Sequence, residues 1–303
     1  MEKQYIVLAK QVPDTKKVTG KAMKEDGTVN RAALPAIFNP DDMYALEMAL
    51  RLKEQFGGTI TVLTMGPPTA NDILRQALYR GADKCILLTD RKFAGSDTLA
   101  TSMVLSHAIK KIGKYSLILC GRQAIDGDTA QVGPQVAEKL DLPQITYVED
   151  VLHVGKSSVE VKKLIENGYE IQECVLPALL TFCSPSGAES RPASAKKIQK
   201  YKNATTFSEM VMKFTASGMS RPDAEKAALD VKKSNNGGSP AIEEWDITNI
   251  DLDEALCGLN GSPTWVKQIE SVVLAGKEHK RIPATSEGIS ALVHELISDH
   301  ILD

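Results

Sequence analysis

The chain has 303 residues, of which 43% are hydrophobic, so it can bury a full core in one large domain or in a domain with an appendage. Thirty-six Lys and Arg residues stand against thirty-nine Asp and Glu residues. The resulting net charge of -3 disfavours nucleic acid and acidic membrane surfaces as partners. No sequence segment is long and apolar enough to predict a membrane span.

The cysteines predict reduced thiols. They are odd in number, scattered, and without a C-x-x-C pair, which disfavours a zinc site, an iron–sulfur cluster or a redox dithiol. The N-terminal residues open directly into a strand-like run and lack the apolar stretch of a signal peptide. We therefore expect a cytoplasmic protein.

Short apolar runs alternate with amphipathic stretches along the first half of the chain. The runs predict strands at residues 5–12, 59–64, 85–89 and 117–120. The stretches between them predict helices at residues 41–55, 71–80, 97–111 and 129–140. Four such repeats predict an α/β fold, an open and mostly parallel twisted sheet flanked by helices.

Two further patterns predict additions to this sheet. Residues 16–38 contain Asp26 and Gly27 between polar flanks, which is typical of a hairpin. After Tyr147 the pattern changes to short alternating runs at residues 151–153, 159–164 and 169–172, with a turn at Asn167 and Gly168. We expect these runs to extend the sheet with antiparallel strands.

The composition changes after the core, which predicts three parts. Residues 1–197 form the nucleotide-binding α/β domain, and residues 198–240 form a linker or insert with short helices. In the insert, Phe207, Met210, Met212 and Phe214 predict a helix whose apolar face either docks a partner protein or covers the core. Residues 241–303 carry one predicted helix, at residues 286–301, and isolated apolar side chains such as Trp245 and Trp265. We expect an extended C-terminal arm that packs on a partner chain.

The segment 120–134 follows a predicted strand and precedes a predicted helix, where open α/β sheets bind ligands. Gly121, Gly127 and Gly133 allow the backbone to approach a phosphate, and the helix start offers unpaired N–H groups. A tight turn before a capped helix explains these glycines equally well.

Polar side chains of the same segment suit a nucleotide. Arg122 can add charge-assisted hydrogen bonds, and Thr129 and Gln131 neutral ones. Asp126 and Asp128 would repel a bare phosphate, so they either cap the helix or bind ribose hydroxyls.

Three other loops are predicted at the same edge of the sheet. They contain Asn39 to Asp42, Met65 and Gly66, and the helix start at Asp97 and Thr98. Gly66 could admit an adenine or a ribose, while Asn39 and Asp41 also fit ordinary turn and cap roles. Convergence of four loops favours a ligand site.

No catalytic constellation and no metal-ligand motif accompany these loops. The five histidines are dispersed, and the sequence has no G-x-S-x-G, H-E-x-x-H, Walker or G-x-G-x-x-G motif. A nucleotide site without reacting side chains indicates that a cofactor carries the chemistry.

The chain resembles beta subunits of electron transfer flavoproteins. The motifs that carry the resemblance span residues 12–15, 39–42 with the following Ala-Leu-Glu, 64–68, 81–83, 89–91 and, above all, 121–134. The resemblance covers nearly all of residues 5–182 and resumes at Trp245 and at residues 258–264. It implies an adenine nucleotide alpha hydrolase-like fold and a heterodimer. The alpha subunit of that heterodimer holds an FAD in a mobile domain and is partly embraced by the beta subunit's tail.

The resemblance also implies a cofactor. Ordinary members bind structural AMP in the beta subunit. In electron-bifurcating members a second FAD takes that place, accepts hydride from NADH, and divides the electrons between ferredoxin and the other FAD. Residues 64–68, 89–95 and 121–129 are similar to the bifurcating kind, so we favour FAD over AMP. The chain would then be an electron carrier whose oxidoreductase activity exists only in the heterodimer.

Carried over by position, the resemblance assigns the nucleotide contacts to four groups of residues. These are Leu8 and Ala9; Asn39, Pro40, Asp41 and Asp42; Met65, Gly66, Asp97, Thr98 and Thr101; and Gly121, Arg122, Gln123, Ala124, Ile125, Asp126, Gly127, Asp128, Thr129, Ala130, Gln131, Val132 and Gly133.

The partners are less constrained. A loop that in relatives reads Asn-Glu-Pro-Arg-Tyr and docks an acyl-CoA dehydrogenase differs here at residues 184–192. The terminal partner is therefore left open between a flavin dehydrogenase and an enoyl-CoA reductase. An ATP-using enzyme of the pyrophosphatase kind would need a Ser-Gly-Gly-x-Asp-Ser loop after the first strand, and residues 10–14 are not such a loop.

Overall fold

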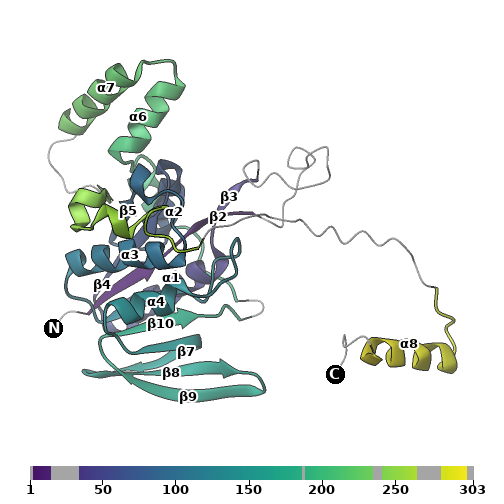
Figure 1. Cartoon of the computed structure of the whole chain (residues 1–303). Coiled ribbons are helices and arrows are strands. Elements are labelled where there is room, and N and C mark those ends of the chain that lie inside the picture. The colour runs from purple at the N-terminus through teal and green to yellow at the C-terminus, as the bar shows by residue number, and fades with distance from the viewer. Residues whose placement is uncertain (1–2, 15–33, 186–187, 235–240, 265–280, 299–303) are drawn as a thin grey trace.

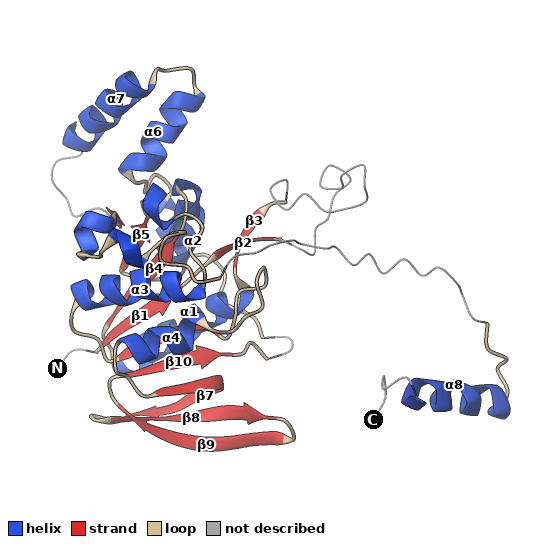
Figure 2. Ribbon diagram, in the orientation of Figure 1, coloured by secondary structure: helices blue, strands red, loops and turns tan. Residues whose placement is uncertain are grey.

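The computed structural model describes residues 3–14, 34–185, 188–234, 241–264 and 281–298. A nine-stranded sheet runs through the molecule in the order β11-β5-β4-β1-β6-β10-β7-β8-β9 (Figures 1 and 2). Its parallel strands are, from the edge, β11 (Ile242–Trp245), β5 (Lys84–Leu88), β4 (Thr59–Met65), β1 (Gln4–Leu8), β6 (Leu117–Gly121), β10 (Ala178–Phe182) and β7 (Gln144–Val154). Two antiparallel strands, β8 (Ser158–Ile165) and β9 (Gly168–Val175), complete it. The fold class predicted from the sequence is confirmed.

Alternation along the strands explains the two layers of helices. Tyr5 and Val7 of β1 lie in one core with α1 (Pro40–Phe56) and α2 (Asn71–Arg80). Ile6 and Leu8 lie in the other core with α3 (Thr98–Ile112) and α4 (Val132–Lys139). Because both faces of the central strands are covered, these strands are predominantly apolar and carry apolar residues on both faces.

The predicted first strand is divided in two. β1 ends at Leu8, and residues 11–13 form β2 (Gln11–Pro13), which pairs antiparallel with β3 (Ala36–Phe38) outside the large sheet. The chain leaves the sheet at Lys10, whose backbone N–H donates to Asp42 instead of to a neighbouring strand. The predicted turn at Asp26 and Gly27 lies outside the described residues.

Two strands were not predicted. β10 is a five-residue buried run in the centre of the sheet, and β11 is a four-residue strand in which Ile242 and Trp245 are the buried positions. Other boundaries differ as well: β7 begins at Gln144 rather than at residue 151, α4 begins at Val132 rather than at residue 129, and the β8–β9 turn lies at residues 166–167, one residue before the predicted one.

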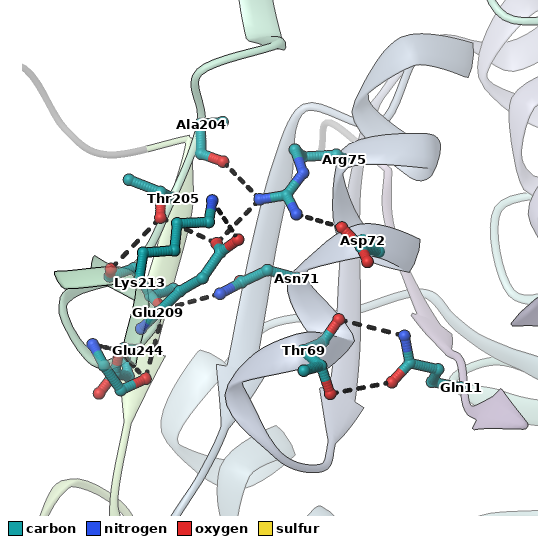
Figure 3. A network of polar contacts seen from close by, with 12 residues as sticks. Gln11, Thr69, Asn71, Asp72, Arg75, Ala204, Thr205, Glu209, Lys213 and Glu244 are labelled. Atoms are coloured by element: carbon teal, nitrogen blue, oxygen red, sulfur yellow. Dashed lines mark hydrogen bonds and ion pairs between the residues drawn. The ribbon is translucent and has the colours of Figure 1, made fainter. Parts of the chain in front are cut away.

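Helix α5 (Ala195–Tyr201) spans the predicted boundary at residue 197, and the insert then forms a helical hairpin of α6 (Phe207–Ala216) and α7 (Arg221–Ser234) that projects from the sheet domain (Figure 1). A polar network fixes the base of α6 to α2 (Figure 3). Arg75 donates to Glu209 over 2.8 Å and to the Ala204 carbonyl over 3.0 Å, and Asn71 donates to Thr206 over 2.7 Å. The predicted amphipathic helix is therefore present, and a buried ion pair holds it in place.

The segment 241–264 corrects the expectation that everything after residue 240 packs on a partner. β11 pairs with β5, and the following turns η5 (Ile247–Ile250) and η6 (Glu254–Leu256) are continuous with the core. Trp245, Ile247 and Ile250 are buried with α3 and α4. Only α8 (Ser286–Ser298), among the described elements after residue 264, stands away from the sheet domain (Figure 1).

Among the described residues no helix is long and apolar enough to cross a membrane.

The ion pair at the base of α6 yields a stability prediction. Glu209 is 3% exposed, and Glu209→Gln removes the carboxylate that joins α6 to Arg75, which keeps Asp72 of its own helix as a charged partner. We expect a loss of about 2 kcal/mol, the usual contribution of a hydrogen bond between charged groups. Amide hydrogen exchange should show it as lost protection in α6 and α7. The control Arg221→Ala removes an exposed pair with Glu225 and should cost ~0.5 kcal/mol or less. Equal protection in both variants would contradict the anchoring role.

Candidate functional site

The strand order reverses at β1, which lies between β4 and β6. The chain runs outward from β1 through β4 to β5, and α3 then returns it to β6 on the other side of β1. Ligands of open α/β sheets bind in the crevice that such a reversal leaves at the carboxyl ends of the strands. All the residues predicted for the nucleotide site lie at this edge.

Asp42 crosses the crevice. Its Oδ2 accepts the backbone N–H of Lys10, just after β1, over 2.9 Å, and its Oδ1 accepts the backbone N–H of Gly121, at the end of β6, over 2.8 Å. A Cβ on Gly121 would lie 2.5 Å from Asp42 Oδ1, so position 121 requires glycine. Burial raises the pKa of Asp42 to about 7, although the bonds from Gly121, Lys10 and Asn39 oppose the rise. Asp42 thus ties the two strands together.

Asn39 and Lys10 fasten the loop that follows β6. The fully buried Asn39 donates to the Gln123 carbonyl over 2.8 Å and accepts the N–H of Ile125 over 3.1 Å. Lys10 Nζ pairs with Asp126 at 2.7 Å, which compensates that negative charge. The first half of the loop, residues 121–126, is therefore held by the β1–α1 segment.

The second half of the loop is open. No atom lies within 4 Å of the place where a Cβ on Gly127 would sit, and the φ of Gly127 is outside the left-handed region. Asp128 and Ala130 both have φ of 52°, a strained conformation that turns the backbone and delays the start of α4. The Gln131 side-chain oxygen accepts a hydrogen bond from the Thr98 hydroxyl of α3 over 3.0 Å. This bond closes one side of the open segment 127–131, which we call the cradle.

Gly133 serves packing rather than access. A Cβ there would lie 2.9 Å from Thr181 Cγ2 and 3.0 Å from Cys120 Sγ. Its lack of a side chain lets α4 pack closely against β6 and β10. The sequence-based expectation that Gly133 admits a phosphate competes with this packing role.

Arg122 lies to one side of the cradle. Its guanidinium is 5.5 Å from the centre of the Tyr147 ring, and its Nε is 4.0 Å from Asp41 Oδ2. Tyr147 has φ of 56° at a shift in the β7–β10 register, which turns its ring outward. Burial raises the pKa of Asp41, against the hydrogen bond from Ser184 and the charge of Arg122. No sequence pattern indicated Tyr147.

Asp97 caps α3. Its Oδ1 accepts from the N–H of Ala100 over 3.0 Å, and its Oδ2 accepts from the N–H of Thr264 over 3.1 Å and from the Thr264 hydroxyl over 2.6 Å. Burial raises the pKa of Asp97, but these bonds outweigh it and the pKa is lowered. The C-terminal segment thus braces this helix start, a contact that the sequence did not predict.

The remaining predicted residues lie at the same edge of the sheet, within its strands and helix starts. Leu8 and Ala9 end β1 in the core, and the Ala9 N–H donates to the Leu63 carbonyl over 2.9 Å. Met65 ends β4, and the Gly66 N–H donates to the Leu88 carbonyl over 3.0 Å. The other positions are Pro40 at the start of α1, Thr101 in α3, Ala124 and Thr129 in the loop, and Val132 at the start of α4.

Some buried polar atoms at this edge of the sheet have no hydrogen-bond partner within the described residues. Among the described residues, Thr64 Oγ1, Arg122 Nε and Thr181 Oγ1 are buried atoms without a hydrogen-bond partner. Thr64 is next to the end of β4 and Thr181 next to the end of β10. Buried polar atoms are nearly always satisfied, so these atoms suit a site that a polar ligand or water completes.

Comparison with known proteins gives a family. A profile described as the electron transfer flavoprotein domain matches residues 26–206, more than half of the chain. The electron transfer flavoprotein subunit beta of Clostridium acetobutylicum is 38% identical over 297 residues, which cover 98% of this chain and 99% of the relative. The caffeyl-CoA reductase-Etf complex subunit CarD of Acetobacterium woodii is 39% identical over 99% of this chain and 100% of the relative.

A third relative is more similar over a shorter stretch. The acryloyl-CoA reductase electron transfer subunit gamma of Anaerotignum propionicum is 50% identical over 188 residues, which cover 61% of this chain and 69% of the relative. The full-length matches and the matching domain confirm the resemblance carried by the sequence motifs. The chain belongs to the electron transfer flavoprotein family, as a protein of the beta-subunit type.

Proposed function

We propose that this chain is the nucleotide-binding beta subunit of a heterodimeric, electron-bifurcating flavoprotein. It binds FAD at the crevice between β1 and β6 and receives electrons from NADH. It passes them to ferredoxin and, through an FAD of the alpha subunit, to a flavin dehydrogenase or enoyl-CoA reductase. The observation that carries the proposal is the open cradle of residues 127–131 above the braced crevice.

The described residues fit a dinucleotide. Gly127 leaves room for a phosphate against the backbone, and the Lys10–Asp126 pair removes one repulsive charge from the loop. Arg122 can supply cationic N–H donors beside the cradle, and the Thr98 hydroxyl, which donates to Gln131, keeps its acceptor capacity. The polar side-chain atoms of Asn39, Asp42 and Asp97 already form hydrogen bonds within the chain. We therefore assign these residues to positioning and not to ligand contact.

The protein's share of the mechanism is binding and orientation. When bound, the flavin supplies the hydride acceptance and single-electron chemistry. Loop residues 121–126 fix the distance between the cradle and the sheet, and the start of α4 places N–H groups near the phosphates. No group of His, Cys, Asp and Glu residues suited to a metal ion occurs in the described ranges. We assign no catalytic side chain.

Helix α8 of the C-terminal arm carries an apolar stripe that suits a contact with the partner subunit. Ile289, Val293 and Ile297 recur every fourth residue of α8, and no residue of that helix is buried in this chain. Such a stripe favours a partner surface, and we propose the alpha subunit. The names of two relatives, a caffeyl-CoA reductase-Etf complex subunit and an acryloyl-CoA reductase electron transfer subunit, support a CoA-ester reductase as terminal acceptor. All five cysteines are free, which supports a cytoplasmic setting.

The cofactor content of the native heterodimer tests the proposal. After denaturation, two FAD and no AMP per heterodimer are expected, because each subunit then holds one flavin. One FAD with one AMP would replace bifurcation by simple electron carriage with a structural AMP in this subunit. A preparation with no nucleotide beyond the alpha-subunit FAD would contradict a nucleotide site in this chain.

Gly127→Ala tests the cradle directly. The added methyl meets no protein atom within 4 Å, so the melting temperature should be unchanged. A nucleotide lying against Gly127 would be displaced, and an overpacking cost of about 1.4 kcal/mol corresponds to tenfold weaker retention. The measurement is the nucleotide retained per heterodimer after gel filtration.

The matched control is Gly155→Ala, where the new methyl makes only ordinary contacts with Ser158 in the turn between β7 and β8. Retention should equal that of the wild type. Full retention by Gly127→Ala as well would place the nucleotide elsewhere.

A further inference from the structure

Asp42 is a buried carboxylate with two backbone partners from strands that are far apart in the sequence. The Lys10 and Gly121 N–H groups reach it from the ends of β1 and β6, at 2.9 Å and 2.8 Å. No cation pairs with it among the described ion pairs. Its ionised form is therefore held by N–H dipoles across the proposed nucleotide site.

Protonation changes what this carboxyl group can do. The ionised form accepts on both oxygens, whereas the neutral form carries a hydroxyl that opposes one of the two N–H donors. One strand end then loses its tie. Because Gly121 begins the loop whose second half is the cradle, movement at Gly121 reaches residues 127–131.

We infer that Asp42 is a proton-linked positioning residue, whose ionised carboxylate holds β1 and β6 at the spacing required by the nucleotide and whose protonation releases that hold. The inference rests on the proposed nucleotide site. It assigns Asp42 no contact with the ligand.

The charged groups around Asp42 set its titration. Asp41 of α1 repels the ionised form, and burial is the larger cause of a pKa of about 7. Cys120 of β6 is a buried thiol whose own pKa is raised, so it stays neutral. The cations nearby are engaged with other acids: Lys10 pairs with Asp126 and Arg122 lies beside Asp41. The carboxyl group can therefore change charge near neutral pH.

Stability and retention should depend on pH in opposite directions. The folded pKa of Asp42 is raised from 3.8 to about 7, so its contribution to folding is fully present below pH 3.8 and is lost as pH rises through 7. The strand tie, by contrast, needs the ionised form and is gained as pH rises through 7. A purely structural role would make nucleotide retention follow stability.

The experiment measures nucleotide release from the native complex between pH 5.5 and 8.5. We expect release from the wild type to quicken about tenfold as pH falls through 7, the effect of one hydrogen bond to a charged group. Asp42→Asn should release quickly at every pH, without the step. A step that persists in Asp42→Asn, or wild-type release that does not change with pH, would overturn the inference.

A matched control is Asp83→Asn. Asp83 also accepts a backbone N–H, that of Ile60 at 2.8 Å, but at the opposite end of the sheet. This variant removes the same charge and should keep the pH step. Loss of the step in Asp83→Asn would show that the step reflects general stability, which contradicts the inference.

A readout without nucleotide separates the inference from the proposed function. In the full chain within its complex, labelled with ¹⁵N-glycine, the Gly121 amide should shift with a midpoint near pH 7 and should not shift in Asp42→Asn. If no nucleotide is found at any pH, the proposed function fails, but the Gly121 amide still shows whether the charge of Asp42 controls its bond to β6. A Gly121 amide whose shift does not change with pH overturns the inference, whatever the nucleotide content.

Discussion

The carboxylate of Asp42 is the interaction on which the arrangement of the site depends. It joins the backbones at the ends of β1 and β6, the two strands between which the order of the sheet reverses. A reversal leaves a crevice because adjacent loops diverge there. In this chain the buried side chain of Asp42, at the start of α1, lies at the base of that crevice. The pKa of Asp42 is raised because burial disfavours its charged form.

The two halves of the loop after β6 have different roles because only the first half is bonded to the start of α1 and to Lys10. Residues 121–126 are held by contacts with Asn39, Asp42 and Lys10. Residues 127–131 are turned outward by two left-handed positions and keep open space at Gly127. Rigid support on one side and free backbone on the other is the arrangement a bound cofactor needs, since its orientation depends on groups that do not move.

Sequence patterns predicted the central sheet because β1, β4, β5 and β6 are buried on both faces and are therefore predominantly apolar. β11 escaped prediction because two of its four residues are glutamates and its strand character comes from pairing with β5, more than 150 residues earlier. The candidate site residues were named from their positions after strands and from the family resemblance, but the contacts that they make with one another were not predicted. That Asp42 bonds Gly121, 79 residues away, cannot be read from local spacing.

The most direct measurement is an experimental structure of the native complex with its nucleotide. The account predicts a phosphate or pyrophosphate against the backbone of residues 127–131, with Asp42 beneath it and bonded to Lys10 and Gly121. A nucleotide bound away from the crevice between β1 and β6, or Asp42 in direct contact with it, would contradict the account.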